Sequence, residues 1–239
     1  MKIALIGYGK LGKVIEQIAI TRGHEITLKV TKANAESYQL SGCEIAIEST
    51  GPVSASKNIT KCLDAGLPIV VGSTGWYDDF EMIKAETNSK NGALLYATNF
   101  SVGVHIFWEA NKMLAQLMKI QPDYRVSLTE IHHTAKKDAP SGTAITTAEV
   151  ILEQLQTQKH WKLVNEFENK DVTSLQVKAI REGDVNGTHI VTYESKVDKI
   201  ELKHEAFNRS GFALGAVLAA EFLQNKKGVY SMRDVIGSF

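Results

Sequence analysis

Residues 130–144, EIHHTAKKDAPSGTA, bring together the side-chain types needed to protonate an anion. His132 and His133 can donate a proton near neutral pH, because histidine titrates there. Lys136 and Lys137 follow a few residues later and supply positive charge. The segment is too polar for a hydrophobic core. Its composition suits a small, doubly anionic substrate that must be protonated.

The end of this segment is typical of a loop that runs into a helix. Pro140 fixes the approach, and Ser141 or Thr143 can cap the helix. Backbone N–H groups at a helix start bind carboxylates well, so Ser141-Gly142-Thr143 is a candidate anion site. Each feature also has a purely structural explanation, since such caps are common, paired lysines are usually solvated and histidines often serve hydrogen-bond networks. Their combination in one short segment favours an active site.

Strands and a helix must position these groups. Tyr124–Leu128 alternates apolar and polar residues, as a half-buried strand does, and it leads into Glu130 and the histidines. The helix that starts near Ser141 continues to Leu155. Asn186-Gly187 is a strong hairpin signal. We expect a long helix at residues 101–120 and further strands at residues 175–179, 190–197 and 199–204. The simplest arrangement is a mixed sheet with few helices, one face of which could be buried against another subunit.

The chain begins with a strand, a glycine turn and a helix. Lys2–Ile6 is a β-prone run, and Gly7-Tyr-Gly-Lys-Leu-Gly12 follows it directly. An amphipathic helix comes next, with Gly23 at its end, and Glu25–Val30 is the second strand. In G-x-G-x-x-G the first glycine permits the tight turn, the second lets the backbone approach a pyrophosphate, and the third lets helix and strand pack. Between a strand and a helix, the pattern favours dinucleotide binding over a purely structural glycine turn.

The alternation of strand and helix continues. We expect strands at residues 44–49, 68–72 and 93–97 and a helix at residues 59–65. The turns Gly72-Ser73-Thr74 and Ala97-Thr98-Asn99-Phe100 directly follow two of these strands. Ligands of open parallel sheets bind at the carboxyl ends of strands, so both turns belong on the cofactor side. Residues 211–224 predict a buried helix, and residues 228–237 are expected to return to the N-terminal lobe and cover its sheet.

The end of the second strand bears on the choice of cofactor. An acid there would bind the adenine ribose hydroxyls and repel a phosphate, but the chain reads Lys29-Val-Thr-Lys32. Thr31 and Lys32 can tolerate or pair with a 2′-phosphate, which favours NADPH or the use of both NADPH and NADH. The alternative is that Lys29 and Lys32 are solvated loop charges.

The composition argues against several classes of function. Basic and acidic residues number 27 each, so no long-range field attracts nucleic acid or an anionic membrane. Hydrophobic residues make up 44%, as in ordinary soluble proteins, and no apolar run is long enough for a membrane-spanning helix. Cys43 and Cys62 lack a CxxC spacing, and we expect buried thiols in a cytoplasmic protein. No metal site is predicted.

The polar segment resembles the signature of one enzyme family. His132-His-x-x-Lys136-x-Asp-Ala-Pro-Ser-Gly-Thr-Ala144 looks like that of the dihydrodipicolinate reductases, the 4-hydroxy-tetrahydrodipicolinate reductases of bacterial lysine and diaminopimelate biosynthesis. Other family elements occur in the same order and spacing, namely Gly7–Gly12, Gly72–Thr74, Ala97–Val104, Phe212–Ala216 and Tyr230–Gly237. The resemblance covers nearly the whole chain.

The resemblance implies a reaction and a set of site residues. Members reduce an unsaturated cyclic imine dicarboxylate with NADH or NADPH, usually as homotetramers assembled through the sheets of their substrate domains. By resemblance His132 is the proton donor and Lys136 its catalytic partner. The implied substrate-binding residues are His133, Ser141, Gly142 and Thr143. The implied cofactor-binding residues are Gly7, Tyr8, Gly9, Lys10, Leu11, Gly12, Thr31, Lys32, Gly72, Ser73, Thr74, Ala97, Thr98, Asn99 and Phe100.

Three positions depart from the family pattern. Thr31 stands where many members carry an acid, which leaves the choice between NADH and NADPH open. Ser73 stands in a Gly-Thr-Thr turn and keeps a hydroxyl there. Glu205 stands where many members have a basic residue, which affects a local contact and not the reaction.

We therefore predict an α/β chain with a Rossmann-like dinucleotide-binding domain, residues 1–100 and 209–239. An α+β substrate-binding and oligomerisation domain with a mixed open sheet occupies residues 101–208. The predicted reaction is the NAD(P)H-dependent reduction of 4-hydroxy-tetrahydrodipicolinate, via dihydrodipicolinate, to tetrahydrodipicolinate. Hydride goes to ring C4 and the proton comes from His132. The expected partners are a small dicarboxylate and further copies of the chain in a homotetramer, with no nucleic acid and no membrane.

Two other functions stay open. Another Rossmann reductase of amino-acid precursors, such as a semialdehyde dehydrogenase, would need a cysteine nucleophile at a strand-to-helix turn. A non-catalytic NAD(P)-sensing module would keep the glycine turn but would not need His132 and Lys136 together.

Overall fold

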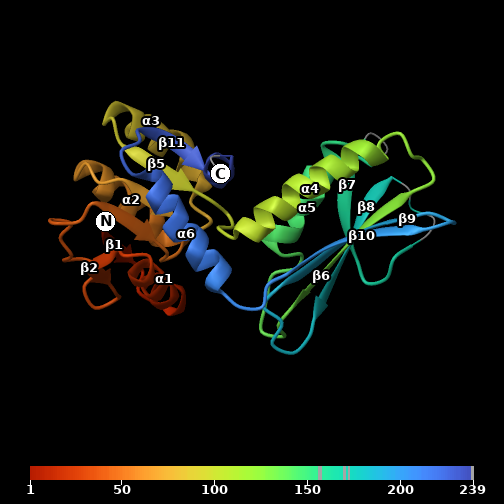
Figure 1. Ribbon diagram of the computed structural model, residues 1–239, viewed down its shortest axis with the longest axis horizontal. Coiled ribbons are helices and arrows are strands. Elements are labelled where there is room, and N and C mark those ends of the chain that lie inside the picture. Colours follow the sequence, from red (N-terminus) through yellow and green to blue (C-terminus); the bar gives the residue numbers. More distant parts are fainter. Residues whose placement is uncertain (156–157, 169–170, 172, 238–239) are drawn as a thin grey trace. The chain divides into compact units, whose positions relative to one another are not determined.

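The computed structural model of the protein describes residues 1–155, 158–168, 171 and 173–237. The chain forms two compact units (Figure 1). Unit 1 comprises Met1–Val102 and Arg209–Phe239, and unit 2 comprises Gly103–Asn208. Each unit has its own sheet and its own buried apolar core.

Unit 1 alternates strands and helices along the chain. Its strands are β1 (Lys2–Ile6), β2 (Glu25–Val30), β3 (Ile45–Glu48), β4 (Ile69–Val71), β5 (Ala93–Tyr96) and β11 (Gly228–Ser231). Its helices are α1 (Lys10–Thr21), α2 (Pro52–Asp64), α3 (Phe80–Ser89, after the short turn η1 at Tyr77–Asp79), α6 (Ser210–Leu223) and α7 (Met232–Ile236). The predicted elements lie within a few residues of these bounds, except that α2 begins well before residue 59. The sequence patterns did not indicate α3.

The six strands of unit 1 are all parallel, in the order β11-β5-β4-β3-β1-β2. The chain runs from β1 to β2 on one side and then crosses to β3 on the other side of β1. A topological switch point therefore lies between β1 and β3, where such folds bind ligands at the carboxyl ends of the strands. The C-terminal segment does return to this sheet. It adds β11 as an edge strand beside β5, and α7 then buries Met232 and Val235 in the core.

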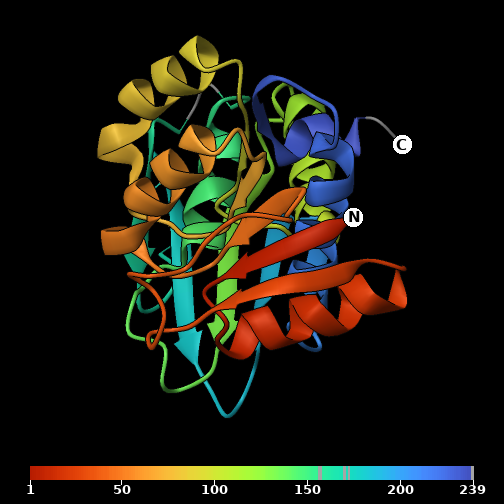
Figure 2. The same cartoon turned by 90° about the vertical axis from the view of Figure 1, so that its left-hand side faces the viewer.

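Helices cover both faces of the unit 1 sheet (Figure 2). On one face α1 and α6 bury residues such as Ile15 and Val217, and on the other α2 and α3 bury Ile59 and Ile83. The central strands are thus covered on both faces, which explains why β1 and β4 are continuous apolar runs in the sequence. The predicted Rossmann-like fold is confirmed.

Unit 2 is rich in strands. Its strands are β6 (Arg125–His132), β7 (His160–Val164), β8 (Ser174–Arg181), β9 (Thr188–Glu194) and β10 (Lys199–Glu205). Its helices are α4 (Val102–Met118), which starts at the boundary with unit 1, and α5 (Gly142–Leu152). The strands form a mixed sheet in the order β10-β9-β6-β8-β7, as predicted for this part of the chain. The sequence patterns did not indicate β7.

The prediction of a hairpin at Asn186-Gly187 is wrong. Central strand β6 pairs antiparallel with β9 and parallel with β8, so it separates the two strands that this turn joins. The pairing of β6 with both neighbours fixes the sheet order. Asn186-Gly187 therefore lies in the connection that leads from β8 past β6 to β9, and not in a tight hairpin turn. The observed hairpin joins β9 to β10, where the backbone N–H of Ser195 donates to the carbonyl of Asp198 at 2.9 Å.

Strand β6 is longer than the sequence indicated. It continues past Leu128 to His132, so Glu130 and His132 lie within the strand. Side chains alternate along a strand, and Glu130 and His132 therefore share the face of Leu128. That face is covered by α4 and α5, whose residues Phe107 and Ala148 pack in the same apolar cluster as Leu128.

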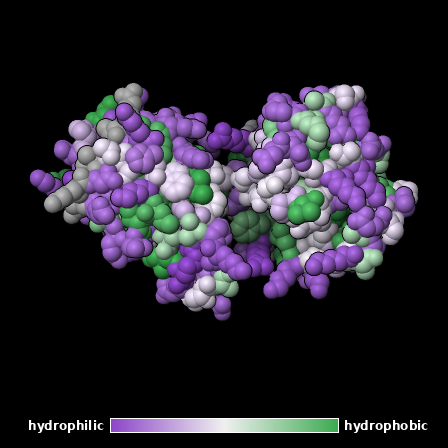
Figure 3. Space-filling view, turned by 180° about the vertical axis from the view of Figure 1, so that it is seen from behind, coloured by the Kyte–Doolittle hydropathy of each residue, from purple (hydrophilic) through white to green (hydrophobic). Residues whose placement is uncertain are grey.

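The surface carries polar residues interspersed with small apolar patches on the face seen in Figure 3. Three large exposed apolar side chains, Ile106, Met113 and Leu117, lie along α4, whereas Val53 is on α2 and Val197 is in the turn between β9 and β10. Within the described residues, no helix is long and apolar enough to cross a membrane.

Candidate active site

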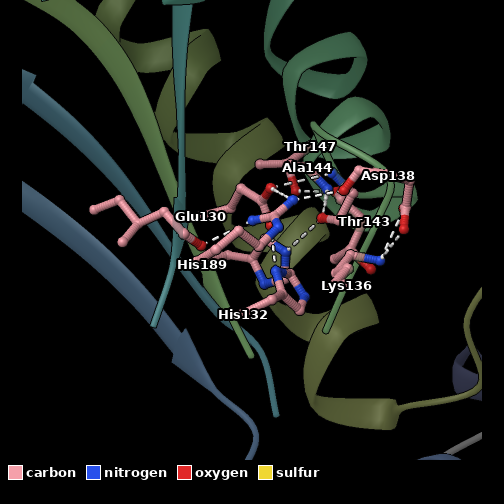
Figure 4. Close-up of polar contacts among 11 residues, drawn as sticks. Glu130, His132, Lys136, Asp138, Thr143, Ala144, Thr147 and His189 are labelled. Carbon is pink, nitrogen blue, oxygen red and sulfur yellow. Dashed lines mark hydrogen bonds and ion pairs between the residues drawn. The ribbon is translucent and has the colours of Figure 1, made fainter. Parts of the chain in front are cut away.

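A buried carboxylate, Glu130, is at the centre of the candidate site in unit 2 (Figure 4). Its Oε2 atom is in direct ion-pair contact with Nδ1 of His132. Its Oε1 atom accepts from Arg181 at 2.9 Å and from the backbone N–H of Ser141 at 3.3 Å. The side chain of Glu130 is 0% exposed and His132 is 8% exposed. The carboxylate therefore links strand β6, strand β8 and the start of helix α5.

Strand register explains why these side chains meet. Glu130 and His132 are two residues apart on β6 and so lie on one face. Glu130 stands opposite His189 on β9, and His132 stands opposite Arg181 on β8. Residues about fifty positions apart thus become direct neighbours through the pairing of β6 with both flanking strands.

The Glu130 carboxyl group stays ionised over the physiological range. Burial alone would raise its pKa, but the contacts with His132 and Arg181 outweigh this and lower the pKa to about 2. An ionised carboxylate can only accept hydrogen bonds. Glu130 therefore favours a proton on the nitrogen of His132 that it touches.

His189 is the second buried histidine of the site. Its ring lies 5.3 Å from that of His132 in an edge-to-face arrangement, and its Nε2 is 3.2 Å from Oγ of Ser141. Burial, together with the charge of His132, lowers the pKa of His189 to about 3. His189 is therefore neutral at pH 7 and supports the site as a hydrogen-bonding group and not as a charge.

Helix α5 begins where the sequence predicts. Ser141 is its N-cap, and the Ser141 hydroxyl accepts the backbone N–H of Ala144 at 3.1 Å. No acidic residue lies in the first turn of the helix. Gly142 is exposed, and a Cβ built on it would meet nothing within 4 Å. The helix start therefore presents an open surface with a partial positive charge, as an anion site requires.

Lys136 and His133 occupy the loop between β6 and α5. Nζ of Lys136 lies 2.8 Å from both carboxylate oxygens of Asp138, and this ion pair lowers the pKa of Asp138. Neighbouring Lys137 is exposed. The backbone N–H of His133 donates to the carbonyl of Val185 at 2.8 Å, which ties the loop to the connection between β8 and β9.

The structure groups the predicted residues of unit 2 in one region. Figure 4 shows His132, Lys136 and Thr143 on the same side of the sheet end, beside Glu130 and His189. Glu130 was part of the sequence motif, but the sequence assigned it no role, and Arg181 and His189 were missed. Only the spacing of Glu130 two residues before His132 pointed to a shared face. The other two contacts depend on sheet order, which the sequence did not provide.

Glu130, His132 and His189 also offer the side-chain types of a metal site, with ligand atoms within 4.8 Å of one another. A metal ion bound by nitrogen and oxygen stands about 2 Å from each ligand atom, which separates two ligands by about 3 Å or more. In the structure Oε2 of Glu130 and Nδ1 of His132 contact each other directly, as an ion pair and not as two ligands spaced around an ion. The arrangement fits a proton-holding pair.

In unit 1 the glycine turn lies between β1 and α1, at the switch point of the sheet. A Cβ on Gly7 would stand 2.6 Å from the backbone of Ser49, and one on Gly12 would stand 2.7 Å from the carbonyl of Gly7. Both positions therefore require glycine. A Cβ on Gly9 would meet nothing within 4 Å, and the first turn of α1 holds no acidic residue. This open helix start fits a pyrophosphate.

The other predicted cofactor residues follow β1, β4 and β5 at the same carboxyl edge of the sheet. Lys10, Thr74 and Thr98 are exposed there. Ser73 and Asn99 are buried and shape the turns; Oδ1 of Asn99, for example, accepts the backbone N–H of Ser101 at 2.8 Å. The remaining members of the predicted set at this edge are the buried or half-buried Tyr8, Leu11, Ala97, Phe100 and Gly72.

The turn after β2 differs from a simple solvated loop. Oδ1 of Asn34 accepts the backbone N–H of Thr31 at 2.7 Å, and its amide donates to the carbonyl of Lys29 at 3.0 Å. Lys29 lies within β2 and not in the loop, and its exposed side chain pairs with Glu16 at 2.5 Å. Lys32 is exposed and remains the candidate for a 2′-phosphate.

A parallel dinucleotide-binding sheet and a second unit with a buried glutamate–histidine pair define a two-unit, nucleotide-dependent oxidoreductase. Comparison with protein families agrees: residues 1–100 match the model described as dihydrodipicolinate reductase, N-terminus, and residues 103–236 match dihydrodipicolinate reductase, C-terminus. The chain belongs to the dihydrodipicolinate reductase family. Enzymes of this family use NADH or NADPH.

Curated relatives of nearly full length carry one name. The 4-hydroxy-tetrahydrodipicolinate reductase of Christiangramia forsetii is 46% identical over 238 residues, which cover 99% of this chain and 98% of that protein. The enzyme of the same name from Methanococcus vannielii is 34% identical over 241 residues, covering 98% of this chain and 82% of the other.

Solved structures support the fold. Dipicolinate-bound dihydrodipicolinate reductase from Paenisporosarcina sp. TG-14 is similar with a TM-score of 0.75 and 20% identity, over 97% of each chain. Aspartate semialdehyde dehydrogenase II from Vibrio cholerae has a TM-score of 0.54 and 14% identity, over 93% of this chain and 97% of that one. At these identities the likeness concerns the fold alone.

Proposed function

We propose that this protein reduces 4-hydroxy-tetrahydrodipicolinate, by way of dihydrodipicolinate, to tetrahydrodipicolinate in lysine and diaminopimelate biosynthesis. The observation that carries the proposal is the buried Glu130–His132 pair beside an open, acid-free helix start at Ser141. A proton donor next to an anion-binding site is the equipment that this reduction needs. The names of the curated relatives support the same substrate.

The glycine turn and the other turns at the carboxyl edge of the unit 1 sheet would hold NADPH or NADH, with Gly9 nearest the pyrophosphate and Lys32 toward the adenine ribose. When bound, the nicotinamide supplies a hydride to ring C4 of the substrate. In this proposal unit 1 is the cofactor domain and unit 2 the substrate domain.

The start of α5 would bind a substrate carboxylate. Its partial positive charge favours an anion, and Gly142 leaves the approach open. Thr143 and His133 would complete the substrate contacts, and Ser141 holds the loop in shape through its cap and its contact with Glu130. Dipicolinate, the ligand named in the Paenisporosarcina structure, is a ring with two carboxylates and supports this assignment.

The proton would come from His132. Hydride addition at C4 of the conjugated imine moves an electron pair toward C3 and nitrogen, and C3 then takes a proton. His132 gives that proton and becomes neutral. Lys136, held by Asp138, stabilises the negative charge that develops on the substrate.

Assembly through the unit 2 sheet is part of the proposal. Helices α4 and α5 pack on one face of this sheet. The opposite face carries Thr129 and Ile131, which are partly exposed in the single chain. We expect a homotetramer built through this face. Light scattering after size exclusion should give four times the chain mass, and a monomer would contradict it.

The reaction can be tested with the product of the synthase that condenses pyruvate with aspartate semialdehyde. We expect oxidation of NADPH or NADH that depends on this product. Cofactor oxidation no faster than the background without enzyme would rule out the proposed reaction. Aspartate semialdehyde alone should not support oxidation, and this control separates the proposed function from a semialdehyde dehydrogenase.

The alternative as a semialdehyde dehydrogenase lacks a nucleophile. Cys62 is fully buried in α2, and burial, reinforced by the charge of Glu48, raises the pKa of its thiol to about 12. Cys43 precedes β3 and so lies at the amino edge of the sheet, away from the glycine turn. A purely sensing module would bind the cofactor without turnover, and the same assay distinguishes it.

A further inference from the structure

We infer that Glu130 is the positioning residue for the proton donor: it keeps a proton on Nδ1 of His132, so that Nε2 is the nitrogen that protonates the substrate. Gly187 keeps the space beside Nε2 open. This inference rests on the proposed function, in which His132 is the proton donor.

The contact between Glu130 and His132 is exclusive. Oε2 of Glu130 touches Nδ1 of His132, and neither atom has another hydrogen-bond partner among the described residues. Both side chains lie on strand β6, whose pairing on both edges holds them in place. Among the described residues, the polar contact of Nδ1 is therefore with the carboxylate of Glu130.

The carboxylate is itself held from two sides. Arg181 donates to Oε1 at 2.9 Å and also to the backbone carbonyl of Asp138 at 2.6 Å, and the Ser141 N–H donates to Oε1 at 3.3 Å. These donors keep Glu130 ionised and fix its second oxygen toward His132. Since an ionised carboxylate only accepts, Nδ1 must carry hydrogen whether the ring is neutral or charged.

The other ring nitrogen faces Gly187. A Cβ built on this residue would stand 3.0 Å from Nε2 and 3.4 Å from the adjacent ring carbon. Gly187 also has a φ of +154°, which side-chain-bearing residues rarely adopt. Gly187, directly before the first residue of β9, thus leaves the space beside Nε2 open, whereas the Cβ of any other residue would crowd the His132 ring.

The proton balance is simple in this arrangement. The charged ring carries hydrogen on both nitrogens. Nε2–H gives its proton to C3 of the substrate, and the electron pair displaced by the hydride forms the new C–H bond. The ring is left neutral with hydrogen on Nδ1, still facing the unchanged carboxylate of Glu130. Solvent returns a proton to Nε2 before the next turnover.

Other charged or titratable groups surround His132, and they do not replace Glu130. Arg181 comes from β8, and His189 and His204 come from β9 and β10 in register with Glu130. Burial lowers the pKa of both His189 and His204, so these rings are neutral neighbours. From the loop, Asp138 is paired with Lys136. Glu130 is the carboxylate in contact with the ring.

The test compares Glu130→Gln with Glu182→Gln. Glutamine in place of Glu130 keeps the shape of the side chain but loses its charge, while Glu182 is an exposed carboxylate whose backbone N–H donates to the carbonyl of His132 at 2.8 Å. For Glu130→Gln we expect kcat to fall roughly 10- to 100-fold with KM changed less than about threefold. The alkaline limb of its pH profile should move to lower pH, because an amide stabilises the protonated ring less than a carboxylate does. Glu182→Gln should behave as the unaltered protein.

A second readout needs neither turnover nor a variant at position 130. In protein labelled with ¹⁵N-histidine, the neutral His132 ring should carry hydrogen on Nδ1, the less common tautomer in water; His132→Asn assigns the signals. A neutral ring with hydrogen on Nε2 would overturn the inference, as would a Glu130→Gln variant with unchanged kcat and pH profile. Absence of any turnover in the unaltered protein would refute the proposed function instead, and the tautomer would still test the role of Glu130.

Discussion

Lys136 and Lys137 are adjacent in the chain but have different surroundings. Lys136 is partly buried and fixed by both oxygens of Asp138 next to His132 and the start of α5, whereas Lys137 is exposed. A charge that is held in place can stabilise a developing negative charge without first being ordered. The sequence already favoured Lys136 by resemblance, and its ion pair gives a physical reason for the difference.

For this reason Lys136→Ala should lower turnover about a hundredfold or more, with the dissociation constant of the cofactor kept. Lys137→Ala is the matched control and should retain the turnover of the unaltered protein. Steady-state kinetics and cofactor titration measure both quantities. Equal turnover in the two variants would remove Lys136 from the mechanism.

Lys32 is the residue on which the cofactor preference can be tested. It is exposed on the turn after β2, which Asn34 holds in shape. Lys32→Ala should weaken NADPH binding about fivefold and leave NADH binding unchanged, since a single exposed ion pair contributes about 1 kcal/mol. Fluorescence titration gives both dissociation constants. Lys2→Ala, at the amino end of β1, is the control. If Lys32→Ala affects both cofactors equally, Lys32 does not contact the 2′-phosphate.

At the scale of elements, β6 and α5 form the site together. Strand β6 presents Glu130 and His132 on one face, and α5 brings its N-terminus to the end of that face through Ser141. The Ser141 hydroxyl caps the helix and contacts His189, while its backbone contacts Glu130. One residue therefore joins the proposed carboxylate-binding surface to the proton donor.

Loss of this cap should affect both stability and substrate binding. We expect Ser141→Ala to lower the free energy of unfolding by about 1 kcal/mol and to raise the KM for the substrate several-fold. Ser231→Ala, at the start of α7 where the hydroxyl contacts Asp234 at 2.9 Å, is the control in unit 1. It should change stability without changing the substrate KM. If Ser141→Ala leaves the KM for the substrate unchanged, the Ser141 cap does not contribute to substrate binding.

Local patterns predicted much of the fold and the chemistry-bearing residues. The strand–glycine–helix start, the α5 start near Ser141 and the strand-rich second unit all follow from short-range periodicity and turn residues. The contacts of Glu130 with His189 and Arg181 could not be found this way, because they depend on which strands flank β6. The hairpin expected at Asn186-Gly187 failed for the same reason, since a local turn signal does not reveal an inserted central strand.

At the scale of the whole molecule, acid should destabilise unit 2 through its buried network. His189 takes up a proton at its ordinary pKa of 6.5 when unfolded but only near 3 when folded. Between these values the unfolded chain binds more protons, so stability falls as pH falls below about 6.5. Glu130 adds to this only below its ordinary pKa of 4.5, since its folded pKa is about 2. Above pH 7 neither group contributes a pH dependence.

Between pH 6.5 and 4.5 this dependence comes from His189 and from His204, whose pKa is also lowered by burial. The contribution of His189 to the slope should approach about 1.4 kcal/mol per pH unit, and His189→Gln should lower the slope by that amount, while the part due to His204 remains. Denaturant unfolding in a Trp76→Phe background measures this, because Trp108 and Trp161, the remaining tryptophans, both lie in unit 2. Identical slopes with and without His189 would contradict the assigned pKa shift.

The central claim is that His132 protonates a ring that this protein reduces. The most direct test compares the unaltered protein with His132→Ala in nicotinamide oxidation driven by the product of the condensing synthase. We predict substrate-dependent oxidation by the unaltered protein and at least about a hundredfold slower turnover by the variant, with the cofactor dissociation constant kept. Equal turnover in both would contradict the account.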